Sequence, residues 1–586
     1  ERGSIQGCPL GMVAFCVAQE TALRKGNEQM KTAQTPYADD AAFAGSVVDI
    51  LRDAKQASRA VQDGLGVKRS ALTIYAPGAT ADETETLEAE GATLEKDGTI
   101  YVGTAIGSDD FVRMHAMLKA DEILALLAYA EKVAAEDPSH GTQLVFDWLR
   151  KTAGPTYNHV LRNTPPDLAR AAARKLDTAI VETVIRLCGI ADVHANASLA
   201  DQERAKALIH LPIDEGGLGF HSQELIAEAA YVGAWSASLH RIVGAQGLKI
   251  AQKPDDRPGF LDAFHAAVEK LRPSIPAELT SKLDWRVLWD APLAGAQALL
   301  SKALHADARK RLLASLPTGT SLDERACRLH ALAQNSPEAS AWLLAKVYDQ
   351  RQRLHNEAFT LAIRTRLLLP VDREGKACGG CGADLDNLDA HALCCKKLGG
   401  DQNVRHTSVQ EAVREFLRPQ CAVLIGGPQV SNFYARQPPA AGEAIDNTEW
   451  KGDLGYTLKN TAASTPDIFD AVVTAVVKSA PAPYASVGDA AKAAESEKLR
   501  LYQKRFKIDD HIVPFGVEAT GALGPSAKAL LWRVASNDDA APDIRSARYR
   551  YYICRLSVVL KASAYTIYKR YLTKCVDSLK PPADGE

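Results

Sequence analysis

The feature that most constrains this chain is a short stretch, residues 378–395, which holds four of its eleven cysteines. A Cys-x-x-Cys pair is followed by a histidine and a further cysteine, which is the spacing of a tetrahedral zinc site. Four protein ligands leave no open coordination position, so a structural role is expected, although a cluster of reduced core thiols is an alternative. The expected ligands are Cys378, Cys381, His391 and Cys395, with Cys394 competing for the last position.

The remaining cysteines are scattered, which argues against a disulfide scaffold and indicates a reducing compartment. Hydrophobic residues make up 46% and charged residues 24% of the chain, as in folded globular proteins. A length of 586 residues predicts about two to four domains. The net charge of -3 gives no electrostatic argument for nucleic acid over the whole chain, so any basic surface must be local. The apolar run Gly11–Val17 is too short to span a bilayer.

Residues 1–110 mix short apolar runs with turns and are expected to be the end of an α/β unit. The pattern then becomes helical up to about Leu369, with apolar residues three and four apart. A proline and paired glycines between Leu211 and Phe220 should separate two helices. The segments that carry these patterns are the strand-like runs Ala71–Tyr75 and Thr99–Val102 and the helical repeats Met114–Ala134 and Leu168–Leu187.

Helix and strand patterns alternate in residues 401–586. The expected order is a helix, two strands joined by a polar turn, a helix, a strand and a helix, which predicts an α/β domain. These elements are Ser408–Leu417, Asp453–Leu458, Ile468–Val477, Ala490–Phe506, His511–Val517 and Ser526–Val534.

Near the N-terminus, Tyr37-Ala38-Asp39-Asp40 is expected at the tip of a hairpin, where it would place adjacent carboxylates in one site. Polymerases use such a cluster to hold two Mg²⁺ ions. One ion lowers the pKa of the attacking 3′-hydroxyl, and the other neutralises charge on the leaving pyrophosphate. Upstream, Gly7 in the run Ser4–Gly11 lets the backbone approach a template or nucleotide closely.

Two acidic residues in the C-terminal region could form a second metal site. Asp453 opens one expected strand and Asp470 lies within the next, so a hairpin can bring both carboxylates to one end of a sheet. Phosphodiester cleavage needs such a pair to bind Mg²⁺ and a basic residue, for which Lys498 is the candidate, to assist the attacking water. Asp467, which follows a proline, is a rival, but residues three apart on a strand face opposite sides. Glu518 is either a further site residue or a buried partner.

The Gln-Gly-Cys-Pro and Tyr-Ala-Asp-Asp segments together resemble the reverse transcriptases of non-long-terminal-repeat retrotransposons. The closest resemblance is to the site-specific elements with one C-terminal endonuclease, such as the spliced-leader-associated elements of trypanosomatids. Tyr101–Gly107 is similar to the primer-contacting segment of that family, and Leu211–Gly219 to a segment of its helical thumb. The family's restriction-enzyme-like endonuclease resembles the segments Lys451–Leu454, Asp470–Thr474, Glu495–Tyr502 and Val513–Gly521.

The resemblance implies a multidomain protein that combines α/β and all-α parts. The implied domains are a partial polymerase palm (1–110), a helical thumb or connection (111–370), the zinc knuckle (371–400) and a restriction-enzyme-like endonuclease (401–586). Asp39 and Asp40 would be metal ligands, and Gln6, Gly7 and Tyr37 would belong to the template and nucleotide pocket.

The implied function is nicking of chromosomal DNA by the endonuclease, after which the new 3′ end primes reverse transcription. Mg²⁺ would serve both catalytic sites and Zn²⁺ the knuckle, and the partners would be element RNA, target DNA and deoxynucleotides in the nucleus. The family's first metal-binding aspartate lies upstream of the Gln-Gly-Cys-Pro segment, and the chain begins at Glu1 rather than at a methionine. We therefore expect an N-terminally truncated product, without polymerase activity of its own. Two alternatives are a decayed remnant that still binds nucleic acid and an unrelated helical interaction protein with one structural zinc.

Overall fold

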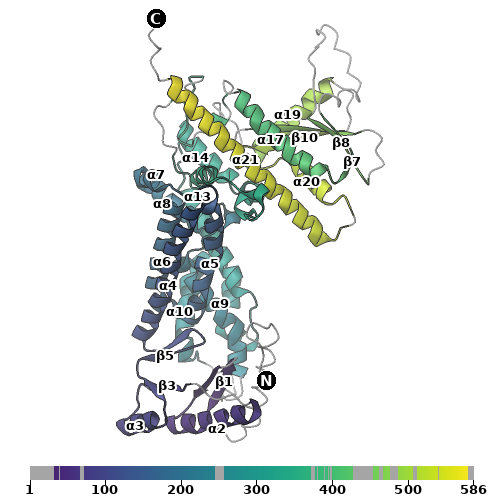
Figure 1. The fold of residues 1–586 in the computed structure, drawn as a ribbon. Coiled ribbons are helices and arrows are strands. Elements are labelled where there is room, and N and C mark those ends of the chain that lie inside the picture. Colours follow the sequence, from purple (N-terminus) through teal and green to yellow (C-terminus); the bar gives the residue numbers. More distant parts are fainter. Residues whose placement is uncertain are drawn as a thin grey trace. The chain divides into compact units, whose positions relative to one another are not determined.

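The protein is described by a computed structural model over residues 32–578 except 38–39, 66–70, 245–255, 371–376, 379–380, 389, 394, 396–398, 427–452, 461–465, 475–485, 506–510 and 539. This part of the chain is mostly helical, with a few small sheets (Figure 1). It divides into two compact units. Unit 1 takes the residues up to Ala125 together with Pro155–Asp177 and Gln223–Leu304, and unit 2 takes Leu126–Gly154, Thr178–Ser222 and the residues from His305 onward.

Three two-stranded sheets lie in the described part of unit 1. The strands β1 (Ala33–Tyr37) and β2 (Asp40–Ala44) form an antiparallel hairpin in which Tyr37 pairs with Asp40, as expected for the Tyr-Ala-Asp-Asp segment. A parallel pair, β3 with β4, is joined by α3, whose first turn is closed by a capping box between Thr80 and Glu83. The remaining elements of this region are α2 (Val47–Leu65), β3 (Thr73–Tyr75), α3 (Ala81–Ala89), β4 (Thr93–Glu95) and the antiparallel pair β5 (Gly98–Tyr101) and β6 (Thr104–Gly107).

The helical core of unit 1 is built around two tryptophans. Trp285 and Trp289 lie one turn apart, with ring centroids 6.0 Å apart, and pack with the buried Phe264 and Leu300. Their removal from water is the main stabilising contribution to this cluster. The elements that supply it are α9 (Gln223–Gly244), α10 (Asp262–Leu271), α11 (Ala277–Lys282), α12 (Trp285–Asp290) and the start of α13 (Ala296–Ala314).

The helical expectation for the middle of the chain is confirmed. The repeat at Met114–Ala134 falls within α4 (Asp109–Glu136), and the repeat at Leu168–Leu187 falls within α6 (Pro166–Leu187). A helix without a sequence expectation of its own, α5 (Gly141–Asn163), lies between them and contains Pro155. Further helices of unit 2 are α7 (Ala191–Asn196), α8 (Leu199–His210), α14 (Leu322–Ala333), α15 (Pro337–Ser340) and α16 (Asn356–Arg366).

The Leu211–Phe220 segment does separate two helices, and the structure gives its glycines a packing role. Gly216 adopts a φ of 86°, which favours glycine, and a Cβ on Gly217 would lie 2.1 Å from the carbonyl oxygen of Leu211. The buried guanidinium of Arg366 donates hydrogen bonds to the carbonyl oxygens of Ile213 and Gly217. These hydrogen bonds from Arg366 to backbone carbonyl oxygens therefore hold the segment in place within unit 2.

The C-terminal part of unit 2 contains a four-stranded sheet in the order β10-β9-β8-β7. The pairs β8–β9 and β7–β8 are antiparallel, whereas β9 and β10 run parallel. The expected hairpin and the following strand are thus confirmed, and the edge strand β7 is an addition that the sequence reading lacked. The strands are β7 (Cys421–Gly426), β8 (Leu454–Leu458), β9 (Asp467–Thr474) and β10 (Ile512–Glu518).

Three helices that match the sequence expectation pack on this sheet, and a fourth packs on two of them. They are α17 (Gly399–Leu417), α19 (Asp489–Arg505), α20 (Pro525–Ala535) and the unforeseen α21 (Pro542–Ser578). Figure 1 shows α17 and α21 lying side by side, and Phe416 stacks on Tyr552 with ring centroids 4.4 Å apart. Among the described residues, no helix is long and apolar enough to cross a membrane.

Candidate metal centres

The first candidate centre is the cysteine-rich cluster. The ligand atoms of its four side chains all lie within 4.8 Å of one another. The Sγ atoms of Cys378 and Cys395 are 3.7 Å apart, and the Sγ of Cys381 lies 3.2 Å from Nε2 of His391. Three sulfurs and one imidazole nitrogen form a donor set that suits zinc. The cluster could therefore hold one zinc ion, as its spacing predicted.

Local backbone structure positions these ligands. The amide of Gly382 donates to the carbonyl of Cys378 over 2.8 Å, and Gly382 has a φ of 72°, so glycine suits this turn. The buried carboxylate of Asp386 accepts hydrogen bonds from the backbone amides of Leu388 and His391 at 3.0 and 3.3 Å. This carboxylate orders the short helix η7 (Ala390–Leu393), which carries the histidine ligand.

The long helix α21 covers the cysteine cluster. Tyr571 is buried against Cys378 and Cys395, with Tyr568 and Leu572 packed beside it. Contacts between sulfur and aromatic rings are favourable. The packing of Tyr571 also helps to keep water away from Cys378 and Cys395, which are both buried. Cys394, the competing fourth ligand, lies outside the described residues.

The second candidate centre lies at one end of the four-stranded sheet. Asp453 directly precedes β8 and Asp470 lies within β9, and the antiparallel register that pairs Leu454 with Phe469 brings the two carboxylates together. His406 of α17 joins them, and the ligand atoms of the three side chains lie within 4.8 Å of one another. This cluster is called the acidic cluster below.

Hydrogen bonds hold Asp453 in place. Its Oδ2 accepts from the backbone amide of Ala471 over 2.7 Å and lies 3.2 Å from Nε2 of His406. Its carbonyl oxygen accepts from Nε2 of Gln410, also on α17, over 2.9 Å. The hydrogen bond to Asp453 raises the pKa of His406, because the carboxylate favours the charged imidazolium.

Asp470 has a more enclosed setting. Its side chain is 5% exposed, and Nζ of Lys498 on α19 lies 2.5 Å from its Oδ1. Burial raises the pKa of Asp470, the ammonium of Lys498 opposes that shift, and the neighbouring Asp453 adds to it. The same environment raises the pKa of Tyr502, through burial and then through the charge of Asp470. A buried carboxylate in this position needs cationic compensation.

The structure brings Asp453, Asp470 and Lys498 together, and it separates Asp467 from them. Asp467 pairs instead with His511 at 3.2 Å and Arg533 at 3.1 Å. This division follows from strand geometry, because residues three apart on β9 point to opposite faces.

Glu518, left undecided by the sequence, acts as a helix cap in the described structure. Its buried carboxylate accepts from the amide of Ala490 in the first turn of α19 and from the hydroxyl of Thr520, both over 3.2 Å. Glu495 does the same for α20, because it accepts from the amides of Ser526 and Ala527 over 3.0 Å. Both acids satisfy amides that a helix N-terminus would otherwise leave without partners.

His406 is the member of the acidic cluster that the sequence reading missed. It belongs to no recognisable motif, and it lies 47 residues before Asp453 on a separate helix. Its only local signal is a position at the edge of the apolar face of α17, next to the buried Val409 and Arg405.

The polymerase residues are described only in part. Tyr37 and Asp40 are paired across the turn of the β1–β2 hairpin. Gln6, Gly7 and Asp39 lie outside the described residues. The expected roles of all five remain predictions.

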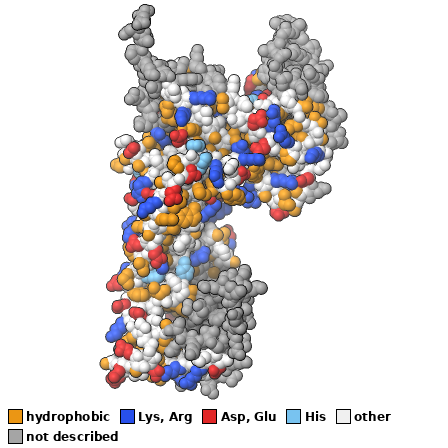
Figure 2. All heavy atoms as spheres, viewed as in Figure 1, with side chains coloured by type: hydrophobic (Ala, Val, Ile, Leu, Met, Phe, Trp, Pro, Cys, Tyr) orange, Lys and Arg blue, Asp and Glu red, His pale blue; other side chains and the backbone are white. Residues whose placement is uncertain are grey.

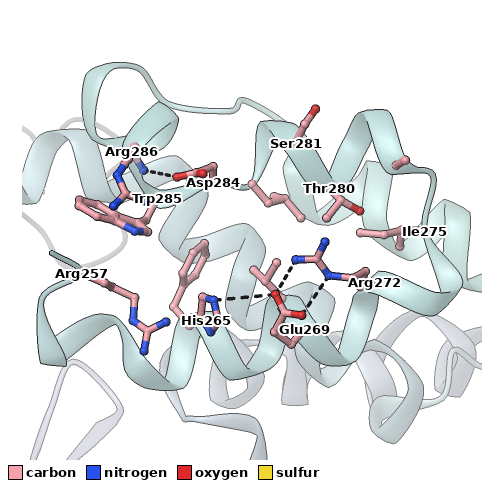
Figure 3. A pocket seen from close by; sticks show the side chains of 14 residues that line it. Arg257, His265, Glu269, Arg272, Ile275, Thr280, Ser281, Asp284, Trp285 and Arg286 are labelled. Carbon is pink, nitrogen blue, oxygen red and sulfur yellow. Dashed lines mark hydrogen bonds and ion pairs between the residues drawn. The ribbon is translucent and has the colours of Figure 1, made fainter. Parts of the chain in front are cut away.

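Unit 1 contains a pocket of about 740 Å³ between α10, α11 and α12 (Figure 3). Its polar side chains are largely engaged with one another. Glu269 pairs with Arg272 at 2.6 Å and lies 3.8 Å from His265, and Arg286 lies 4.6 Å from the ring centroid of Trp285. The described residues of this pocket contain no group of three candidate metal ligands. The pocket therefore differs in kind from the two clusters of unit 2.

Comparisons with known proteins add no functional assignment to this geometry. No protein-family model matches the chain, and no curated protein is significantly similar to it. Any function must therefore be argued from the residues themselves.

Proposed function

We propose that the C-terminal region of unit 2 is a divalent-metal-dependent DNA endonuclease. The observation that carries this proposal is the convergence of Asp453, Asp470 and His406 with Lys498 at one end of the sheet. Two carboxylates that can hold a divalent metal ion, with a lysine beside them, are a set of groups that can hydrolyse a phosphodiester. Perturbed acids gathered in this way also mark functional sites more generally.

The carboxylates of Asp453 and Asp470 would hold a Mg²⁺ ion, because Mg²⁺ prefers oxygen ligands. A bound ion in such a site stabilises negative charge on the phosphate and makes water more acidic. Lys498 would orient the attacking water or neutralise the developing charge, since its ammonium already lies at the site. His406 would fix the position of the Asp453 carboxylate through their hydrogen bond.

The cysteine cluster fits a separate structural role. We propose that Zn²⁺ held by Cys378, Cys381, His391 and Cys395 fixes the segment between α16 and α17. All four positions of a tetrahedral ion would be filled by protein, so this centre would bind no substrate.

At the level of the whole chain, we propose that it belongs to a retrotransposon reverse transcriptase with a C-terminal endonuclease. The order of the Tyr-Ala-Asp-Asp hairpin, the helical region, the cysteine cluster and the acidic cluster supports this proposal. It entails target DNA, element RNA and deoxynucleotides as partners, and a nuclear site of action. Asp39 and Asp40 would hold Mg²⁺ in the polymerase part, with Gln6, Gly7 and Tyr37 near the template and nucleotide.

One observation favours a second candidate, a non-catalytic remnant. The 2.5 Å contact between Lys498 and Asp470 already supplies a cation to the buried carboxylate. In a remnant, this ion pair would replace the metal and the region would bind nucleic acid without cleaving it.

A nicking assay on supercoiled plasmid, with the full chain and added Mg²⁺, separates these candidates. Asp470→Asn should abolish nicking, whereas the matched control Asp467→Asn, on the same strand but outside the cluster, should retain it. Thermal unfolding of both variants would verify their folding. Equal nicking by wild type and Asp470→Asn would contradict the endonuclease assignment. Folded wild-type protein that binds DNA but does not nick it would support the remnant.

A further inference from the structure

A row of polar side chains runs from the acidic cluster along α17. His406, Gln410, Arg414 and Arg418 are each four residues apart, so neighbours lie about one helical turn from one another. Twelve residues of α-helix span about 18 Å. The first three side chains are half-buried at the edge of the packed face, and Arg418, just beyond the end of the helix, is exposed. The row thus leads from the candidate metal site to solvent.

Positive charge accumulates toward the far end of this row. Arg414 forms an ion pair with Glu411 at 3.1 Å, and its side chain remains 34% exposed. The described residues offer no side-chain partner to Arg418. Lys459, in the turn after β8, places its Nζ 2.9 Å from the carbonyl oxygen of Pro419 and is itself exposed. Two cations therefore meet where α17 ends.

Two further arginines pair with one acid of α17 that lies outside the row. Glu415, on α17, is shared by Arg351 at 2.6 Å and Arg555 at 3.6 Å. Together with the row, the surface holds five cations and two acids, Glu411 and Glu415, in a chain whose net charge is -3. Figure 2 shows Lys and Arg side chains on the face over α17 and α21. These cations thus gather toward the end of α17 that lies away from the acidic cluster.

We propose that this basic row is the track on which the backbone of duplex DNA lies, with the reacting phosphate at the acidic cluster and flanking phosphates at Arg414, Arg418 and Lys459. The inference rests on the proposed endonuclease function and names how its substrate is held. B-DNA carries one phosphate charge per about 1.7 Å of axis, so a row of about 18 Å faces about five base pairs. The track lies to one side of the cluster, so contacts extend asymmetrically from the cleavage point.

A competing explanation is that Arg414 and Arg418 only stabilise the C-terminal end of α17, where cations favour the helix dipole. That role would affect unfolding and leave DNA binding unchanged. Binding therefore has to be measured together with stability.

The test compares Arg414→Gln/Arg418→Gln with wild type in the full chain, by fluorescence anisotropy with a 30-base-pair duplex at several NaCl concentrations and without added Mg²⁺. A plot of log affinity against log salt concentration has a negative slope. In the double variant the magnitude of that slope should be smaller by about two, because each of the two lost phosphate contacts contributes about 0.9. Arg500→Gln is the matched control, since Arg500 pairs with Glu497 three residues away on α19, as Arg414 does with Glu411. Its slope should equal that of wild type.

An unchanged slope in the folded double variant would overturn the track, and so would a slope that falls for duplex RNA but not for DNA. A lowered slope without nicking by the wild type would leave the track standing and remove the endonuclease. Nicking by the wild type together with an unchanged slope in the double variant would remove the track and leave the endonuclease standing.

Discussion

The two metal-ligand clusters of unit 2 differ in how the chain assembles them. The cysteine cluster draws its four ligands from residues 378–395 and closes around them with a tight turn and η7. The acidic cluster draws its three side chains from residues 406–470 and depends on a helix, a strand end and the register of a hairpin. The first is therefore encoded by local spacing, whereas the second exists only when the sheet has formed.

They also differ in what a metal ion would displace. In the cysteine cluster the four donors face one another, and thiolates bind zinc strongly enough to couple binding to folding. In the acidic cluster the ammonium of Lys498 already contacts Asp470, so a divalent ion must compete with a built-in cation. A structural ion that stays and a reactive ion that exchanges are the expected consequences of this difference.

The largest expected effect comes from removing the zinc ligands. Cys378→Ser/Cys381→Ser should abolish zinc binding, and structural zinc sites contribute on the order of 10 kcal/mol of binding free energy. Elemental analysis should then find no zinc, and hydrogen exchange should show loss of protection in residues 381–395. Cys327→Ser, which changes a cysteine outside the cluster, is the control. Zinc retained in the double variant would show that other residues bind it.

A smaller effect is expected at the built-in cation of the acidic cluster. Lys498→Met should reduce nicking by about a hundredfold or more, as loss of a group that stabilises transition-state charge commonly does. The same change should strengthen Mn²⁺ binding, because the carboxylates no longer share their charge with an ammonium. The shift of the unfolding temperature on adding Mn²⁺ would measure this. Lys492→Met, at an exposed position of the same helix, should change neither property. Weaker Mn²⁺ binding in Lys498→Met would contradict the competition between cations.

The smallest effect concerns the pH dependence of His406. The raised pKa of this imidazole means that its ion pair with Asp453 stabilises the fold fully below the unfolded-state pKa of about 6.5 and is lost as pH rises through the higher folded-state pKa. His406→Gln should therefore lower the free energy of unfolding at pH 5.5 by at most about 1 kcal/mol, as for a partly exposed ion pair. The difference should shrink at pH 8.5 in urea titrations. In an Asp453→Asn background it should be absent at both values, and persistence there would assign it to other contacts.

The contrast between the clusters also explains what the sequence could predict. Cys378, Cys381, His391 and Cys395 are recognisable because a short loop can bring them together by itself. The proximity of Asp453 and Asp470 could be predicted from the strand pattern, because a hairpin joins the two strands that carry them.

Other features depend on tertiary structure and left no local pattern. His406 becomes a neighbour of Asp453 only through the packing of α17 on the sheet, and Glu518 becomes a cap only because α19 begins beside the end of β10. In the edge strand β7, consecutive residues such as Val423 are exposed or half-buried. The strand therefore lacks the regular alternation of buried and exposed residues that is typical of a half-buried strand.

The helix α21 also sets the order in which the protein can mature during translation. Tyr552 stacks on Phe416 of α17, and Tyr571 covers the cysteine cluster about 28 Å further along the same helix. A nascent chain that has produced every metal ligand still lacks Tyr552, and it lacks Tyr571 until the later part of α21 has also been synthesised. Each cluster is therefore fully packed only after the part of α21 that supports it has been synthesised.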